Sequence, residues 1–382
     1  MRQFSLPMAL VLLLAPFPAF AEERNTAPAT SITLDENGLP IVSVTLHSLK
    51  TPNVARTFRF EVDTGSGWCV VDQSVPSELF WGENQIEATA RDVANQAIES
   101  STLLLKRVEV GGVTRDGIIA HRMDLRNLLG RAQDQPVDRI LGMSFLWGTR
   151  FLPDSKGGRF IWWGEHFRPG VTLPMMEESG SVPRLALRLG ALETSAVLDT
   201  GMGGGVDLPS QLRPKGSGEA IFTTGLTGTQ IAGSEMIVEW LDAGSASWSQ
   251  VPVTFQPEET GGRIGADVWN SAPVCFDFIT NHLTFTTDRA GHLPISREPS
   301  RKLPIVWDRS GLAPRLVVLL VKSGSAMEKA GCKAGDELIQ VGDLPGQALS
   351  RRSVQDLVAS GVKHTWVVRR NGKEVPLTFN AE

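Results

Sequence analysis

Two aspartates in matching tripeptides are the strongest candidates for chemistry in this chain. Asp63 opens Asp-Thr-Gly at the end of a β-rich apolar run, and Asp199 opens the same tripeptide in the second half of the sequence. Two carboxyl groups held close together resist double ionisation, so they share a single proton. One carboxyl then acts as general base and the other as general acid at the same pH. Such a pair is suited to hydrolysis by an activated water molecule.

Each tripeptide begins a longer motif that occurs twice in the same order. An apolar-Gly motif follows, Ile140–Gly142 in the first copy and Ile264–Gly265 in the second. An aspartate comes next, Asp154 or Asp277, and an apolar strand follows it. A single Asp-Thr-Gly is also typical of an ordinary polar turn, because Asp and Gly favour turns. Two copies with matching flanks favour an internal repeat of one mostly-β unit.

The segments inside each copy also favour β-structure. Leu103–Ala120 alternates around Gly111–Gly112, which predicts a hairpin, and Met236–Phe255 shows a similar pattern. Short helices are expected only near Asp124–Leu129 and around Pro209–Gln211. The even spread of 23 prolines and 38 glycines indicates many short strands and turns. The sequence therefore predicts a mainly β protein.

The repeated motifs resemble those of the pepsin- and retropepsin-like aspartic proteases. The resemblance is carried by Phe60–Val71, by Leu198–Gly201 and by the two apolar-Gly motifs, and it extends over roughly residues 31–290. It implies a two-lobed fold, with a first lobe at 22–170 and a second at 171–298.

The activity implied by this resemblance is endopeptidase hydrolysis of a peptide or protein substrate, without a cofactor. Asp63 and Asp199 would be the catalytic pair. Thr64 and Thr200 would hydrogen-bond across the junction of the lobes and hold the two turns rigid. In the same turns, Gly65 and Gly201 would let backbone amides approach the carboxylates.

The residues after the two glycines differ, and one hallmark of pepsin-type enzymes is missing. Ser66 offers a hydroxyl donor to the outer oxygen of Asp63, whereas Met202 offers none to Asp199. Hydrogen bonding to the ionised form lowers a carboxyl pKa, so the sequence assigns the charge to Asp63 and the shared proton mainly to Asp199. Because the chain contains no tyrosine, it lacks a flap tyrosine. A non-catalytic peptide-binding or scaffold protein is therefore the alternative.

The C-terminal part of the chain resembles a bacterial PDZ domain, a small α+β fold. Gly324–Gly331 and Ala334–Ile339 carry this resemblance. The same region predicts a strand at Leu316–Val321 and a helix from about Ser353 to Ser360. Asn371–Gly372 between two β-rich runs predicts a closing hairpin.

The PDZ resemblance assigns a binding role to residues 301–382. Such domains add an extended peptide to a sheet edge and hold its terminal carboxylate in backbone amides. Ser310, Gly311 and Leu312 precede the predicted strand and are the candidates for that carboxylate loop. The implied ligand is a C-terminal peptide, and the alternative is an accessory unit that only stabilises the fold.

The first 21 residues have the pattern of a cleavable signal peptide. Arg2 supplies a short positive region, and the apolar stretch Met8–Phe20 leads to Ala19–Ala21 with small residues at the cleavage positions. The sequence therefore predicts an exported protein, periplasmic or secreted. A membrane anchor, left in place if this segment is uncleaved, is the alternative.

Composition argues against several other functions. The net charge is −5 and no long basic run occurs, which disfavours nucleic acid as a partner. The six histidines are scattered without an HExxH or CxxC pattern, so no metal site is expected. Cys69, Cys275 and Cys332 are too few and too widely spaced for a disulfide framework.

Overall fold

The computed structural model describes most of the chain between residues 27 and 379. Within that range the gaps are 49–50, 52–53, 92–95, 130–132, 136, 163–169, 177–181, 217, 225–228, 258–260, 289–290, 296–302, 312 and 322–323. The predicted signal peptide and Leu312 lie outside the described residues. The structure is mainly β, with 52% strand and 11% helix, as the sequence predicts.

The first β unit contains ten strands and three short helices. Its elements are β1 (Ala29–Leu34), β2 (Pro40–His47), β3 (Ala55–Val62), β4 (Cys69–Asp72), the 3-10 helix η1 (Ser77–Leu79), β5 (Phe80–Arg91), β6 (Ala97–Val110), β7 (Val113–Met123), α1 (Leu125–Leu129), β8 (Arg139–Leu141), α2 (Met143–Leu146), β9 (Arg150–Asp154) and β10 (Arg159–Trp162).

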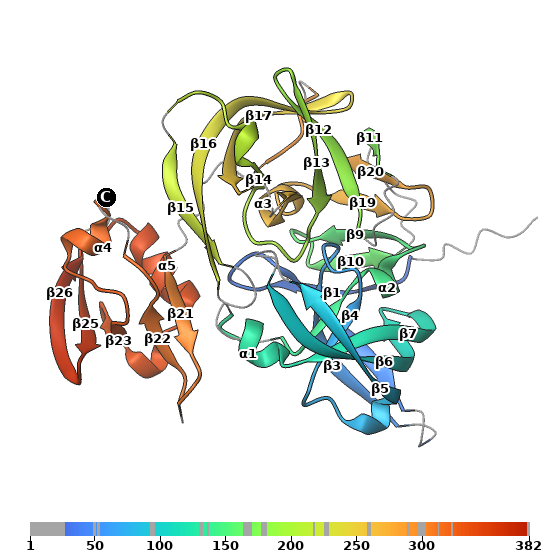
Figure 1. Ribbon diagram of the computed structural model, residues 1–382, viewed down its shortest axis with the longest axis horizontal. Coiled ribbons are helices and arrows are strands. Elements are labelled where there is room, and N and C mark those ends of the chain that lie inside the picture. The colour runs from blue at the N-terminus through green and yellow to red at the C-terminus, as the bar shows by residue number, and fades with distance from the viewer. Residues whose placement is uncertain are drawn as a thin grey trace, which may run out of the picture.

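The second β unit has the same succession of strands. It contains β11 (Val171–Pro174), β12 (Arg184–Leu189), β13 (Leu192–Leu198), β14 (Val206–Pro209), the 3-10 helix η2 (Ser210–Leu212), β15 (Glu219–Thr224), β16 (Gln230–Ala243), β17 (Ala246–Gln256), β18 (Gly262–Ile264), α3 (Ala266–Trp269), β19 (Val274–Asp277) and β20 (His282–Phe285). The two units lie one above the other in Figure 1.

Strand pairing confirms the internal repeat. In the first unit the order is β2-β3-β8-β4-β7-β6-β5, and in the second it is β12-β13-β18-β14-β17-β16-β15. An additional pairing closes each set in the same way, β2 with β6 and β12 with β16. The strand that leads into each Asp-Thr-Gly runs parallel to the strand that carries the apolar residues of the apolar-Gly motif. These pairs are β3 with β8 and β13 with β18.

A shared sheet joins the two units and contributes to one hydrophobic core. Strands β9 and β19 pair antiparallel, with Phe151 opposite Phe276 and Arg150 opposite Asp277. The two phenyl rings stack with centroids 5.0 Å apart, and the Arg150 Nη2 atom lies 2.6 Å from Asp277 Oδ2. The same buried cluster extends from Ile32 to Leu293. The two β units are therefore packed as one body, and the boundary at residues 170 and 171 stays a prediction.

The C-terminal unit is a small α+β arrangement with its own core, at the left of Figure 1. Its elements are β21 (Ile305–Asp308), β22 (Arg315–Val318), α4 (Ala326–Lys329), β23 (Glu337–Val341), β24 (Leu344–Pro345), the 3-10 helix η4 (Gly346–Ala348), α5 (Arg351–Ala359), β25 (His364–Arg370) and β26 (Lys373–Phe379). The predicted closing hairpin is confirmed, with Asn371 and Gly372 at φ 51° and 76° between β25 and β26.

Some local predictions were wrong. In the two β units the sequence predicts helices only near 124–129 and 209–211, yet α2, α3 and η1 also form. Each of these helices is a single turn, too short to produce a helical period in the sequence. The strand predicted at Leu316–Val321 ends at Val318.

All three cysteines are free and buried. Among the described residues, no helix is long and apolar enough to cross a membrane.

Candidate functional site

The two Asp-Thr-Gly turns are held by the same backbone contacts. Asp63 N donates to Leu141 O at 3.1 Å, and Asp199 N donates to Ile264 O at 2.9 Å. These bonds continue the parallel pairing of β3 with β8 and of β13 with β18. The strand that carries the apolar residues of each apolar-Gly motif therefore positions the aspartate of the neighbouring Asp-Thr-Gly turn. This explains why the two motifs recur together.

The glycines of the apolar-Gly motifs are required by close backbone packing. A β-carbon at Gly142 would lie 2.1 Å from Trp68 O, and one at Gly265 would lie 2.7 Å from Met202 O. The next amides bind the same turns, Met143 N to Ser66 O and Ala266 N to Met202 O, both at 2.8 Å. Any side chain at either glycine would displace the adjacent Asp-Thr-Gly turn.

Thr64 and Thr200 link the two turns through a reciprocal hydrogen-bond pattern. Thr64 N donates to Thr200 Oγ1 at 3.0 Å, and Thr200 N donates to Thr64 Oγ1 at 3.1 Å. Each hydroxyl also donates across the junction, Thr64 to Leu198 O and Thr200 to Val62 O. Both threonines are buried. Each turn therefore holds the other in position.

Gly65 and Gly201 place each backbone against the opposite carboxyl group. A β-carbon at Gly65 would lie 2.5 Å from Asp199 Cγ, and a β-carbon at Gly201 would lie 2.5 Å from Asp63 Cγ. Larger residues would collide with the acid groups. The structure thus brings together the predicted residues at 63–66 and 199–201.

The two aspartyl carboxyls lie close enough for each to shift the pKa of the other. Backbone amides of Gly65 and Ser66 donate to Asp63 Oδ1 at 2.8 and 3.1 Å. The amides of Gly201 and Met202 bind the Asp199 carboxyl in the same way. Burial, followed by the charge of Asp199, raises the pKa of Asp63 well above its usual range. Burial also raises the pKa of Asp199, against the opposing effect of Arg263.

The role expected for the Ser66 hydroxyl is wrong. Ser66 Oγ donates to Trp68 O at 2.8 Å, so it is directed into its own turn rather than toward Asp63. Only the backbone amide of Ser66 reaches the carboxylate, and Met202 supplies an equivalent amide to Asp199. The Ser66–Met202 difference therefore does not distinguish the two acids.

A different pair of matched positions makes the two halves electrically unequal. In the first unit Glu61 pairs with Ile140, and in the second unit the matching pair is Val197 with Arg263. The first half thus carries an acid, Glu61, two residues before Asp63, while the second half carries a positively charged arginine opposite the residue two before Asp199. Arg263 lies among buried polar groups, with Nη2 3.1 Å from Asp207 Oδ2 and 3.3 Å from Gln256 Oε1.

This asymmetry reverses the charge assignment made from sequence. Burial raises the pKa of Asp199, while the positive charge of Arg263 and the interaction with Asp63 both lower it. The interaction with Asp199 instead raises the pKa of Asp63, in the same direction as burial. These influences favour the shared proton on Asp63 and the charge on Asp199, opposite to the expectation based on Ser66. These pKa values belong to the coupled pair.

Replacing Arg263 by Gln is expected to shift the acidic limb of the pH–rate profile upward, by roughly one pH unit. Arg263 lowers the pKa of Asp199, so without its charge Asp199 gains a proton at a higher pH and the singly ionised pair is lost earlier on acidification. Glutamine preserves a hydrogen bond to Asp207. The measurement is kcat/KM against pH. Arg188→Gln, in the exposed ion pair with Asp242, is the control and should leave the limb in place.

The predicted carboxylate loop of the C-terminal unit is only partly described. Ser310 and Gly311 lie in the turn between β21 and β22, away from the aspartate pair. The Ser310 amide and hydroxyl both donate to Asp308 Oδ1, at 3.0 and 2.6 Å. A β-carbon at Gly311 would have only Ala313 O near it, at 3.9 Å, so the loop is open there. Leu312 lies outside the described residues, and the binding role of this loop stays a prediction.

Glu61 is a functional candidate that sequence reasoning missed. It is 2% exposed, and burial followed by the charge of Asp63 raises its pKa well above the usual range. Gln133 Nε2 donates to Glu61 Oε2 at 2.9 Å. A signal was present, because residues two apart on a strand face the same side and Glu61 stands two before Asp63. Its buried partner, more than seventy positions away, was not visible.

Within the described part of the chain, no group of three or more His, Cys, Asp or Glu side chains is arranged to hold a metal ion. No family model matches the chain, and no curated protein matches it either.

Proposed function

We propose that this protein is an aspartic endopeptidase of the pepsin- and retropepsin-like type. The observation that carries the proposal is the close approach of each duplicated turn to the opposite aspartyl carboxyl: a β-carbon at Gly65 would lie 2.5 Å from Asp199 Cγ, and one at Gly201 would lie 2.5 Å from Asp63 Cγ. The reciprocal Thr64–Thr200 bonds support it, because they make the two acids one rigid site. In this proposal the two β units are the lobes of the enzyme.

The charge distribution assigns a role to each acid. Ionised Asp199 takes a proton from a water molecule, whose oxygen attacks the carbonyl carbon of the scissile peptide bond. Protonated Asp63 gives its proton to the carbonyl oxygen, which yields a neutral tetrahedral diol. Asp199, now protonated, donates to the leaving nitrogen as the C–N bond breaks, and Asp63 recovers the diol proton. The cycle restores the original protonation state and consumes one water.

The C-terminal unit is proposed to be a PDZ domain that docks peptide or protein segments. Among the described strands β21 pairs only with β22, so it is the edge strand to which a peptide strand would be added. Helix α5 lies beside this strand, with Arg351 Nε donating to Ile305 O at 3.0 Å. Export with removal of residues 1–21 places the proposed enzyme in the periplasm or outside the cell.

The proposal is tested by turnover of an unfolded protein. The chain from residue 22 is incubated with casein between pH 3 and pH 7, and the products are identified by mass spectrometry. Cleavage by the wild type, and none by Asp63→Asn, is the expected result. Binding of peptides without cleavage at any pH would instead support the non-catalytic peptide-binding alternative.

A further inference from the structure

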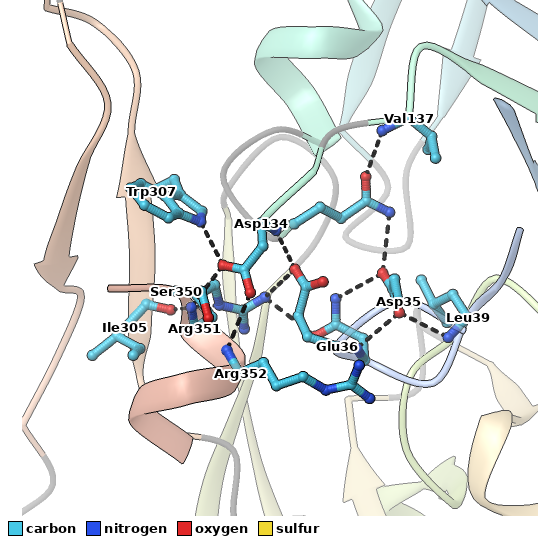
Figure 2. A network of polar contacts seen from close by, with 12 residues as sticks. Asp35, Glu36, Leu39, Asp134, Val137, Ile305, Trp307, Ser350, Arg351 and Arg352 are labelled. Carbon is cyan, nitrogen blue, oxygen red and sulfur yellow. Dashed lines mark hydrogen bonds and ion pairs between the residues drawn. The ribbon is translucent and has the colours of Figure 1, made fainter. Parts of the chain in front are cut away.

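We propose that Glu61 is a positioning residue of the Asp63–Asp199 pair, and that the docked C-terminal unit holds it in place through Gln133. The inference rests on the proposed hydrolytic function. It concerns Glu61, a third buried acid near the pair, and the contact between the first β unit and the C-terminal unit. Figure 2 shows that contact in detail.

Glu61 is placed to influence the proton that the two aspartates share. It lies on β3, on the face from which Asp63 projects, and Val197 at the matching position of the second unit has no charge. The acidic groups that act on Glu61 are Asp63, Asp35 and, from the second unit, Asp199, while the Gln133 amide favours its ionised form. The negative charges of Asp63 and Asp199 therefore favour the protonated form of Glu61. By the same repulsion, an ionised Glu61 opposes loss of the last proton of the pair.

The side-chain amide of Gln133 holds Glu61 in place, and both its nitrogen and its oxygen are hydrogen-bonded. This residue is 1% exposed, and its Nε2 donates to Glu61 Oε2 at 2.9 Å and to Asp35 Oδ2 at 3.3 Å. Its Oε1 accepts from Val137 N at 3.0 Å. Any movement of the backbone at 133 therefore changes the position of the Glu61 carboxyl.

That backbone is held by the C-terminal unit. Arg309 Nη2 donates to Gln133 O at 3.0 Å and to Asp134 O at 3.3 Å. The Asp134 carboxylate accepts from Trp307 Nε1 at 2.8 Å and from the first amides of α5, Arg351 N at 2.6 Å and Arg352 N at 3.2 Å. In Figure 2 the donors from Trp307, Arg351 and Arg352 converge on the Asp134 side chain.

A second contact binds the turn that carries Asp35. Arg351 Nη1 donates to Asn37 Oδ1 at 3.2 Å and lies 3.8 Å from Glu36 Oε1, which in turn accepts from Asp134 N. Arg351 is buried, so this ion pair is shielded from solvent. Segments 35–37 and 133–134 thus contact the C-terminal unit on one side and the Gln133–Glu61 pair on the other. An unbroken series of hydrogen bonds therefore connects the docked C-terminal unit to the Glu61 carboxyl.

The test compares pH profiles of kcat/KM for the full chain. Glu61→Gln is expected to move the basic limb downward by roughly one pH unit, because no neighbouring carboxylate then opposes loss of the last proton. Asp134→Ala is expected to move it in the same direction by a smaller amount, and to add nothing in a Glu61→Gln background. Asp116→Ala, which breaks an exposed ion pair of the first unit, is the control and should change nothing.

Two outcomes would overturn the inference in this assay. One is an unchanged basic limb in both Glu61→Gln and Glu61→Val, the latter being the residue of the second unit. The other is an Asp134→Ala shift that persists in full when Glu61 is already replaced, since the contact would then act by another route. Return of the wild-type limb in Glu61→Asp would support a role for the acid itself rather than for packing.

A measurement without turnover separates this inference from the proposed function. A carboxyl whose folded pKa lies above its ordinary 4.5 keeps a proton that the unfolded chain releases, so the free energy of unfolding falls as pH rises from about 4.5. Urea unfolding of Asp63→Asn should show this fall, and Asp63→Asn/Glu61→Gln should show less of it. Identical curves overturn the inference whatever the wild type cleaves. If the two unfolding curves differ but the wild type cleaves nothing, the proposed function is overturned, and with it any role of Glu61 in hydrolysis. Glu61 would then be a buried acid with a raised pKa and nothing more.

Discussion

Hydrolysis is expected to fall at least about 100-fold in kcat when Asp63 is replaced by Asn, and by a similar factor in Asp199→Asn. Without Asp199 no group accepts the proton of water, and without Asp63 no group protonates the carbonyl oxygen. The change is nearly isosteric, so the backbone amides of Gly65 and Gly201 retain an oxygen to bind. Single-turnover rates on one peptide, at equal protein concentration, provide the measurement.

Two controls make this result specific. Asp116→Asn removes an exposed carboxylate of the same unit and should retain full activity. Near-ultraviolet circular dichroism should be unchanged in both dyad variants, which excludes loss of the fold. Retention of more than about a tenth of the wild-type kcat in either dyad variant would contradict a shared-proton mechanism.

Thr200→Val is expected to lower the free energy of unfolding by roughly 2–5 kcal/mol and to reduce activity with it. The Thr200 hydroxyl accepts from Thr64 N and donates to Val62 O at 2.7 Å, inside a buried junction. Valine has the same shape but leaves both backbone groups without that partner. Urea unfolding followed by tryptophan fluorescence measures the loss.

The hydroxyl itself is tested by two further variants. Thr200→Ser keeps the donor and acceptor and should preserve most of the stability. Thr57→Val removes a hydroxyl from the exposed Thr45–Thr57 pair, which lies at 3.0 Å on the surface, and should cost little. A similar loss in Thr57→Val and Thr200→Val would mean that burial of the junction is not what gives the threonine bonds their value.

The duplicated architecture and the aspartate pair were predictable because their signals are local and occur twice. Strand–turn sequences repeat around Asp63 and Asp199, and the apolar-Gly motifs mark the strands that hold them. One-turn helices such as α2 and α3 were missed because four residues cannot display a helical period.

The electrostatics of the site could not be predicted from neighbours in sequence. Ser66 carries a suitable donor, but its hydroxyl direction is set by Trp68 O, a geometric fact that the sequence does not contain. Arg263 acts on Asp199 only because β18 pairs with β13. Gln133 reaches Glu61 from a loop far along the chain. Long-range contacts therefore favour the charge assignment opposite to the one that local chemistry predicts.

The unequal neighbours of the two aspartates have a consequence for substrate direction. Two identical chains related by a symmetric axis would present equivalent acids, so a bound peptide would have two equally good orientations. Here one continuous chain carries both halves, and Glu61 and Arg263 have no counterparts at Val197 and Ile140. In the proposed mechanism, the general base, Asp199, is therefore always on the same side of a bound peptide. If the protein is the proposed protease, a peptide substrate would therefore be read in a single N-to-C sense, and sequence preferences on the two sides of the cleaved bond would differ.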